Sequence, residues 1–175
     1  NTSDLIREVD TSTGRILGVV APTVPQVSGL WGLAIKAGSP VQGTFTSYNA
    51  SCPGSPDTRA AHFGTGAPRI GGFMAWELRN AQPSQPGVLL VGIRTQNLDL
   101  GIIGMPGCKL ALDPAAFIPA ASSSTGDMRL PIRLRCEPSW VNLTVYSQLG
   151  LLDPGAPHPL KIITTNGLAT KIGSW

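Results

Sequence analysis

The chain has 175 residues, of which 42% are hydrophobic and only 13% are charged, and it carries a net charge of +3. Its length and hydrophobic content suffice for one domain with a buried core, alone or with an appendage. The basic residues are few and scattered, which excludes a surface that tracks nucleic-acid phosphates. No apolar run approaches the roughly 18 residues that a membrane-spanning helix needs.

Glycine and proline punctuate the whole chain. The 21 Gly and 16 Pro residues together exceed a fifth of the sequence. Both residues break helices and mark turns, and the turn signals recur at roughly 8–15 residues, the spacing of short strands. We find no sustained 3.6-residue period. The sequence therefore predicts an all-β fold, an antiparallel β-sandwich of the jelly-roll type.

Residues 1–45 differ from the rest of the chain. Residues 5–9 and 15–20 are predicted strands joined by a turn at 10–14, and residues 29–35 are a third strand. The pattern resembles one blade of a β-propeller, but a single blade cannot close a ring, and three short strands are marginal alone. This strand extension must pack on the rest of the chain, pair with a neighbouring chain, or be the tail of a longer propeller.

Residues 46–175 form the predicted sandwich domain. Residues 64–72 read as a loop, 73–78 as a strand, and the almost wholly apolar 87–93 as a central strand. Residues 98–107 read as a connector. Residues 127–135 and 143–149 alternate as strands do, and Pro131 indicates that the first of them lies at a sheet edge. Asn166-Gly167 is the strongest hairpin signal in the chain.

The chemistry of a reactive site is hard to assemble from this sequence. Ser55, His62 and Asp57 could in principle form a nucleophilic triad, but no GxSxG elbow is present and all three lie in one short, loop-rich stretch. Glu77 is the one acid inside a clear strand, where its phase predicts that it faces solvent. We therefore predict no catalytic residues and no enzymatic activity, with a hydrolase as the lowest-ranked hypothesis.

Metal and cofactor sites are not indicated either. Cys52, Cys108 and Cys136 include no CxxC pair, so neither a zinc nor a redox motif is supported. The oxygen-rich residues 10–14 lack the second acid of a calcium loop. In an oxidising compartment two cysteines pair, and the third is either buried or bridges to another chain.

Six residues are the candidates for an interface or a ligand surface. Trp140 and Trp175 are the tryptophans most expected to be exposed, whereas Trp31 and Trp76 are expected in the core. Arg129, Arg133 and Arg135 alternate, which places them on one strand face. That face is either solvated or a contact surface for an anionic glycan or an acidic subunit. Cys136 is the remaining candidate.

Six short motifs follow one another in an order that resembles a known kind of domain. They are CPGS at 52–55, ELRNAQP at 77–83, VLLVG at 88–92, MPGCKL at 105–110, LTVYSQLGLLDPGAP at 143–157 and TNGLATKIG at 165–173. The series resembles a C-terminal, Gly/Pro-rich β-sandwich domain of secreted proteins from environmental bacteria, which has no assigned activity. The resemblance spans residues 48–173. It implies a β-sandwich, export, and a Cys52–Cys108 disulfide that leaves Cys136 over.

These observations favour a non-catalytic protein of the extracellular space or cell surface. The chain begins at Asn1 without Met, so we expect a processed or excised product whose signal peptide is gone. Our first hypothesis is a self-associating surface or filament subunit, a homo-oligomer or polymer that uses its N-terminal strands for subunit contacts. The alternative is a carbohydrate-binding or adhesive module of a secreted protein.

Overall fold

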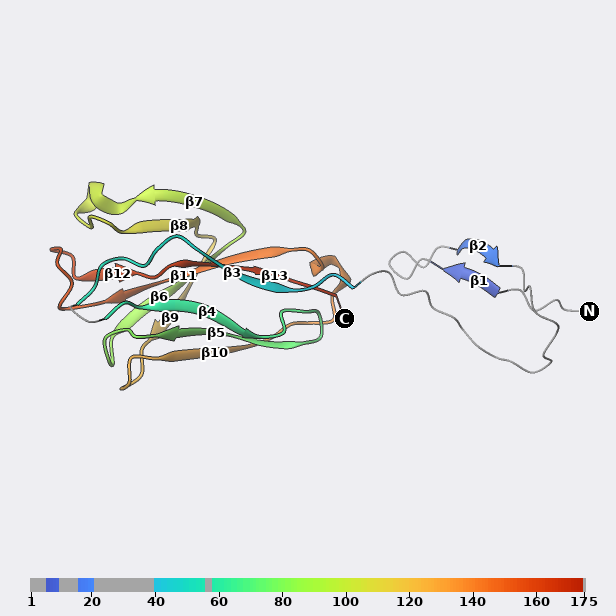
Figure 1. Cartoon of the computed structure of the whole chain (residues 1–175), viewed down its shortest axis with the longest axis horizontal. Coiled ribbons are helices and arrows are strands. Elements are labelled where there is room, and N and C mark those ends of the chain that lie inside the picture. Colours follow the sequence, from blue (N-terminus) through green and yellow to red (C-terminus); the bar gives the residue numbers. More distant parts are fainter. Residues whose placement is uncertain (1–5, 10–15, 21–39, 56–57, 175) are drawn as a thin grey trace, which may run out of the picture. The chain divides into compact units, whose positions relative to one another are not determined.

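The computed structural model describes residues 6–9, 16–20, 40–55 and 58–174. The fold is all-β, the described part of the chain contains two short 3-10 helices, and its named strands pair antiparallel (Figure 1). It divides into two compact units, Asn1–Pro40 and Val41–Trp175. The elements are β1 (Ile6–Val9), β2 (Ile16–Val20), β3 (Thr44–Tyr48), β4 (Ala61–Gly66), β5 (Phe73–Arg79), β6 (Pro86–Gly92), β7 (Arg94–Asp99), η1 (Leu100–Ile103), β8 (Lys109–Asp113), β9 (Ala116–Ala121), β10 (Met128–Arg133), η2 (Pro138–Trp140), β11 (Thr144–Leu152), β12 (Ile162–Thr164) and β13 (Gly167–Lys171).

The first unit contains a two-stranded sheet. β1 pairs with β2, and Ile6 lies opposite Val20. This confirms the pairing expected for the first two strands. The predicted third strand at 29–35 lies outside the described residues, so the likeness to a propeller blade stays a prediction. The predicted domain boundary after residue 45 falls inside β3, because the backbones of Thr44 and Phe45 already pair with β13.

The second unit is a β-sandwich, as the sequence predicts. Its larger sheet has the order β3-β13-β11-β6-β9, with β12 also pairing β11, and its smaller sheet has the order β10-β5-β4. The hairpin β7–β8 lies along the other side of the larger sheet (Figure 1). Among the described residues no helix has the length and apolarity needed to span a bilayer.

The core fills the space between the two sheets. Alternate residues of β11, among them Leu149 and Leu151, join the core with Trp76 and Leu78 of β5. The indole Nε1 of Trp76 donates a 3.0 Å hydrogen bond to the hydroxyl of Thr170 on β13. This polar contact satisfies a buried donor and ties the two sheets together.

The opposite face of β11 holds the β7–β8 hairpin through one buried amide. The Gln148 Nε2 donates to the carbonyl of Lys109 at 2.9 Å and to that of Thr165 at 2.7 Å, and its Oε1 accepts from the N–H of Ala111 at 2.9 Å. Tyr48 adds a 3.2 Å hydrogen bond from its hydroxyl to the Ala111 carbonyl. Burial, helped by the neighbouring Tyr146, raises the pKa of Tyr48 to about 12, so this donor keeps its proton at neutral pH.

Two strand predictions are confirmed in position as well as type. The central strand predicted at 87–93 is β6, which ends at Gly92 and pairs with β11 on one side and with β9 on the other; its adjacent residues Leu89 and Leu90 are both buried, whereas Ile93 is exposed. β10 lies at the edge of the smaller sheet and contains Pro131. Proline lacks the N–H that an interior strand must donate, which is why an edge accommodates it.

Two strands extend into stretches that the sequence predicted to be irregular. The last three residues of β4 lie in the predicted loop at 64–72, and the last two residues of β7 lie in the predicted connector at 98–107. The start of the predicted loop is wrong because Gly64 was interpreted as a turn residue. A Cβ at Gly64 would overlap the ring of Phe45 on β3, so this glycine serves a close approach between strands rather than a turn.

The hairpin predicted at Asn166-Gly167 is wrong. β12 and β13 do not pair with each other; both pair with β11, where Gly150 lies opposite Thr164 and Ser147 opposite Leu168. The register shifts by one residue between these pairs, which is the signature of a bulge. Neither Asn166 nor Gly167 has the positive φ that the predicted turn requires.

Asn166 is held in this bulge by its side chain. Its Nδ2 donates to the hydroxyl of Ser47 and to the carbonyl of His62, both at 2.7 Å, and its Oδ1 accepts from the N–H of His62 at 2.9 Å. The amide thereby joins β3, β4 and the chain before β13. A buried amide with all these partners competes successfully with the local turn preference.

We expect Asn166→Ala to lower the free energy of unfolding by roughly 1–3 kcal/mol for each buried group that it leaves unpaired. Denaturant unfolding followed by circular dichroism measures the change. Asn97→Ala is the matched control, since Asn97 is exposed on β7, and it should shift stability by less than about 0.5 kcal/mol. Equal midpoints for the two variants would contradict this role of Asn166.

Candidate functional site

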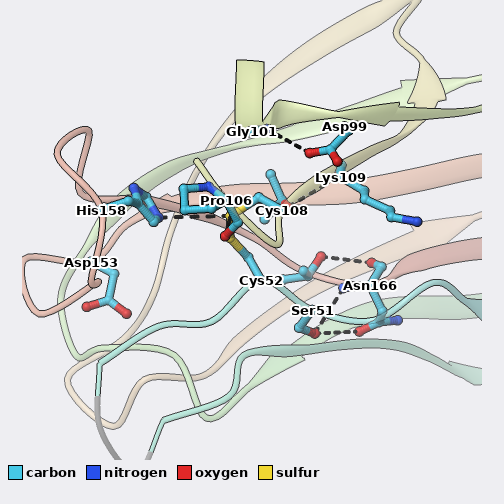
Figure 2. The surroundings of a disulfide bond; sticks show 12 residues. Ser51, Cys52, Asp99, Gly101, Pro106, Cys108, Lys109, Asp153, His158 and Asn166 are labelled. Atoms are coloured by element: carbon cyan, nitrogen blue, oxygen red, sulfur yellow. Dashed lines mark hydrogen bonds between the residues drawn. A yellow bond between two sulfur atoms is a disulfide. The ribbon is translucent and has the colours of Figure 1, made fainter. Parts of the chain in front are cut away.

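A disulfide joins two loops at one end of the sandwich. Cys52 precedes β4 and Cys108 precedes β8, and the two cysteines are bonded and fully buried (Figure 2). The N–H of Cys52 donates to the carbonyl of Thr164 at 2.8 Å, which fixes this cysteine beside β12. The pair is the one implied by the family resemblance.

The chain leading to Cys108 is a capped, tightly bonded loop. The Asp99 carboxylate accepts from the N–H of Gly101 at 2.7 Å and begins η1 (Figure 2). Gly104 ends η1 in the left-handed region, with φ of +85°, which favours glycine. Leu100 and Met105 are buried beneath the loop, so Ile102 and Ile103 are left exposed above it.

A second loop, between β11 and β12, lies beside the first. Asp153 is fully buried and accepts from the N–H groups of Ser55 and Gly155, at 2.7 and 3.0 Å, and from the Ser55 hydroxyl. Farther along, the Nε2 of His158 lies 3.9 Å from the Sγ of Cys108 (Figure 2). We call the two loops, residues 99–108 and 153–162, the disulfide end.

His158 has one unusual atom. Its Nδ1 is buried and is the one buried side-chain nitrogen or oxygen without a hydrogen-bond partner among the described residues. The ligand atoms of Cys52, Cys108 and His158 lie within 4.8 Å of one another, an arrangement that could hold a metal ion if both sulfurs were thiolates. Since the two sulfurs are bonded to each other, neither is such a donor in this structure.

The residues of the hypothetical triad are not brought together. Ser55 bonds to Asp153, whereas the Nε2 of His62 contacts the hydroxyl of Ser147 at 2.8 Å. Asp57 lies outside the described residues. His62 and Ser147 are both fully buried within the sandwich, where substrate has no access to the hydroxyl. This pair acts as a structural contact between the two sheets.

Glu77 is buried rather than solvent-facing, which corrects our expectation. It does point away from the core, as its phase predicts, but it is only 9% exposed. The hydroxyl of Thr65 donates to it at 2.7 Å, and Arg79 and Arg129 each lie 3.7 Å from its carboxylate. Neighbouring side chains on the sheet surface therefore cover it.

The three predicted arginines are all exposed; Arg129 and Arg133 lie at alternate positions of β10, and Arg135 lies beyond its end. The Nε of Arg129 lies 3.7 Å from the carboxylate of Glu77. The guanidinium of Arg133 lies over the ring of Phe73, with its Cζ 5.4 Å from the ring centroid. Arg135 follows the end of β10, and its carbonyl accepts from the N–H of Gly71.

The other interface candidates are dispersed. Cys136 is a free, exposed cysteine. Trp140, in η2, is half-buried and lines a mainly apolar cavity of about 290 Å³ between the two sheets. Its ring is thus less available as a stacking platform than predicted. Trp175 lies outside the described residues.

Sequence reasoning missed the exposed aliphatic residues of the disulfide end. Their solvent exposure is 80% for Ile102 and 55% for Ile103, and Leu160 and Ile162 are also exposed. The available signal was the pair of isoleucines between Gly101 and Gly104. Residues of this type normally indicate burial, so the pattern did not distinguish a core segment from an exposed tip.

Comparisons with protein-family models, with curated proteins and with solved structures found no match to this chain. The family resemblance of the six motifs therefore stays a prediction.

The disulfide should make a large contribution to stability. Cys52 and Cys108 are separated by 56 residues. A cross-link that closes a loop of this length lowers the entropy of the unfolded chain and thereby stabilises the folded state by roughly 4 kcal/mol. In a Cys136→Ser background, Cys52→Ser/Cys108→Ser should lose about this free energy of unfolding in urea. In the wild type, denatured without reductant, one thiol per chain should react. Three reactive thiols would contradict the disulfide.

His62 should make the fold sensitive to mild acid. Burial lowers the pKa of His62 to about 4, against the opposing effect of its hydrogen bond to the Glu77 carbonyl. The unfolded chain, whose histidine has an ordinary pKa near 6.5, takes up the proton at a higher pH than the folded chain does. The contribution of His62 to the free energy of unfolding is therefore full above about pH 6.5 and falls as the pH drops towards 4. This loss is on the order of 3 kcal/mol.

Unfolding free energies of the wild type and His62→Gln at pH 7 and pH 4.5 test this effect. The variant should be less stable at pH 7 but should lose less stability between the two pH values. A pH dependence equal to that of the wild type would show that another group is responsible.

Proposed function

We propose that the chain is a non-catalytic structural protein of the extracellular space or cell surface, which self-associates through its N-terminal strands. The observation that carries this proposal is the division of the chain into two units. In the first unit, β1 and β2 form a two-stranded sheet that pairs with none of the other described strands. Such a hairpin is marginally stable alone, so it gains stability from a partner.

The sandwich has a core of its own. Among the residues whose side chains the structure describes, every buried core residue belongs to the second unit, from Cys52 to Ile172. Two of its edge strands, β9 and β10, carry Pro119 and Pro131. A proline removes a backbone hydrogen-bond donor and discourages edge-to-edge pairing. These two edges are therefore protected against uncontrolled pairing with strands of other chains.

The proposed location follows from the cysteine chemistry and the surface. A buried disulfide persists in oxidising compartments, such as the bacterial periplasm, the cell surface and the extracellular space. The low charge, 13% of residues, leaves a surface built largely from uncharged side chains. Such a surface offers little electrostatic repulsion between copies and suits close subunit packing.

Sedimentation velocity and negative-stain microscopy of the full chain and of residues 41–175 test the proposal. The full chain should form assemblies whose size rises with concentration, and the fragment should remain monomeric while it retains its β-sheet spectrum. A full chain that stays monomeric up to the highest soluble concentration would refute self-association. Equal assembly of the fragment would assign it to the sandwich alone.

A further inference from the structure

The chain enters the sandwich at the end opposite to the disulfide end. The N–H of Val41 donates to the hydroxyl of Ser174 at 2.8 Å, and the N–H of Ser174 donates to the Val41 carbonyl at 2.9 Å. Figure 1 shows this entry beside the C-terminus, whereas η1 and the β11–β12 loop lie at the other end of the sandwich. The second unit therefore has two chemically different ends.

The disulfide end presents apolar side chains from both of its loops. Ile102 is 80% exposed, the largest value for a large hydrophobic residue among the described residues, and Ile103 is 55% exposed. Leu160 and Ile162 are exposed in the segment that follows His158. The contact between His158 and Cys108 brings this segment next to the η1 loop.

This surface is held in place before any partner arrives. The disulfide, the Asp99 cap of η1 and the buried Asp153 fix the two loops by separate interactions. Both nearby carboxylates are occupied, since Asp99 bonds to Gly101 and Asp153 bonds to Ser55. Association at a preorganised apolar surface costs little ordering entropy, and large apolar side chains exposed on two neighbouring loops suit an interaction site.

We propose that the disulfide end of one copy receives the Asn1–Pro40 unit of the next copy, which rests on the self-association proposed above. The donor strands are rich in aliphatic residues, with Ile6 and Val9 in β1 and Ile16, Leu17, Val19 and Val20 in β2. Because the donor leaves the sandwich at the end opposite to the receiving surface, the contact is head-to-tail. Such a contact can repeat without limit and yields a filament of one polarity.

Ile102→Glu/Ile103→Glu in the full chain tests the receiving surface. Each glutamate would bring an unpaired carboxylate into an apolar contact, so association should weaken at least about tenfold, a change of 1.4 kcal/mol or more. Phe73→Glu/Phe117→Glu is the matched control. These two phenylalanines are each 66% exposed on β5 and β9, away from the disulfide end, and their replacement should leave assembly intact. Circular dichroism and thiol counting confirm the fold of both variants.

A capping experiment tests the polarity. Residues 41–175 keep the receiving surface but lack the donor, so their addition should shorten the filaments of the full chain in proportion to their amount. The same fragment with Ile102→Glu/Ile103→Glu should not shorten them. Shortening by both fragments would overturn the inference.

The outcomes separate the two proposals. If the wild type assembles and the isoleucine variant assembles equally well, self-association stands and the receiving surface is wrong. If the phenylalanine variant alone fails to assemble, the contact lies on the sheet faces instead. A wild type that stays monomeric refutes both proposals. Co-sedimentation of that monomer with phosphatidylglycerol–phosphatidylcholine vesicles, abolished by the isoleucine changes, would reassign the surface to lipid.

Discussion

The buried amide of Gln148 is the contact on which the disulfide end depends. Gln148 lies on the face of β11 opposite to the main core, where the hydroxyls of Tyr48 and Thr164 give the β7–β8 hairpin two further hydrogen bonds, each of 3.2 Å. Its three hydrogen bonds, to Lys109, Ala111 and Thr165, join the hairpin, the central strand and the bulged chain before β13 at one point. A fully satisfied buried amide specifies one register, because any shift would leave costly unpaired groups. The disulfide then needs only to close an end that is already aligned.

The fold was predictable wherever apolar periodicity acts locally. The apolar run of β6 placed this strand correctly in the interior of its sheet, and Pro131 placed β10 correctly at an edge. Prediction failed where a residue serves a distant neighbour. Gly64 makes room for Phe45, and Asn166 bonds to Ser47 on the adjacent strand β3 and to His62 in the opposite sheet. A local sequence signal reports what the backbone prefers when no partner is present, and these partners come from strands far away in the chain.

The candidate site was less predictable, for a related reason. Residue types alone left the cysteine pairing open, and the resemblance of the motif series implied Cys52–Cys108. The exposure of Ile102 follows from the burial of its neighbours Leu100 and Met105, which only the folded loop reveals. The burial of Glu77 depends in the same way on Thr65, Arg79 and Arg129, which lie on two flanking strands and on its own strand. The phase of a strand predicts which face a side chain occupies, but the neighbours on that face decide whether water reaches it.

The prolines lie on edge strands of the sandwich and the exposed isoleucines lie at one of its ends, so the edges and this end differ in chemistry. Pro119 and Pro131 lie on edge strands, which are the surfaces where β-proteins most readily associate without control. The exposed aliphatic side chains of the η1 loop lie instead at a tip, on a turn that is capped and cross-linked. Blunted edges and one apolar end leave few orientations for an association. In the assembly that we propose, the chain enters each sandwich at the end opposite to the apolar one, so the arrangement that uses both ends is the one in which successive copies point the same way.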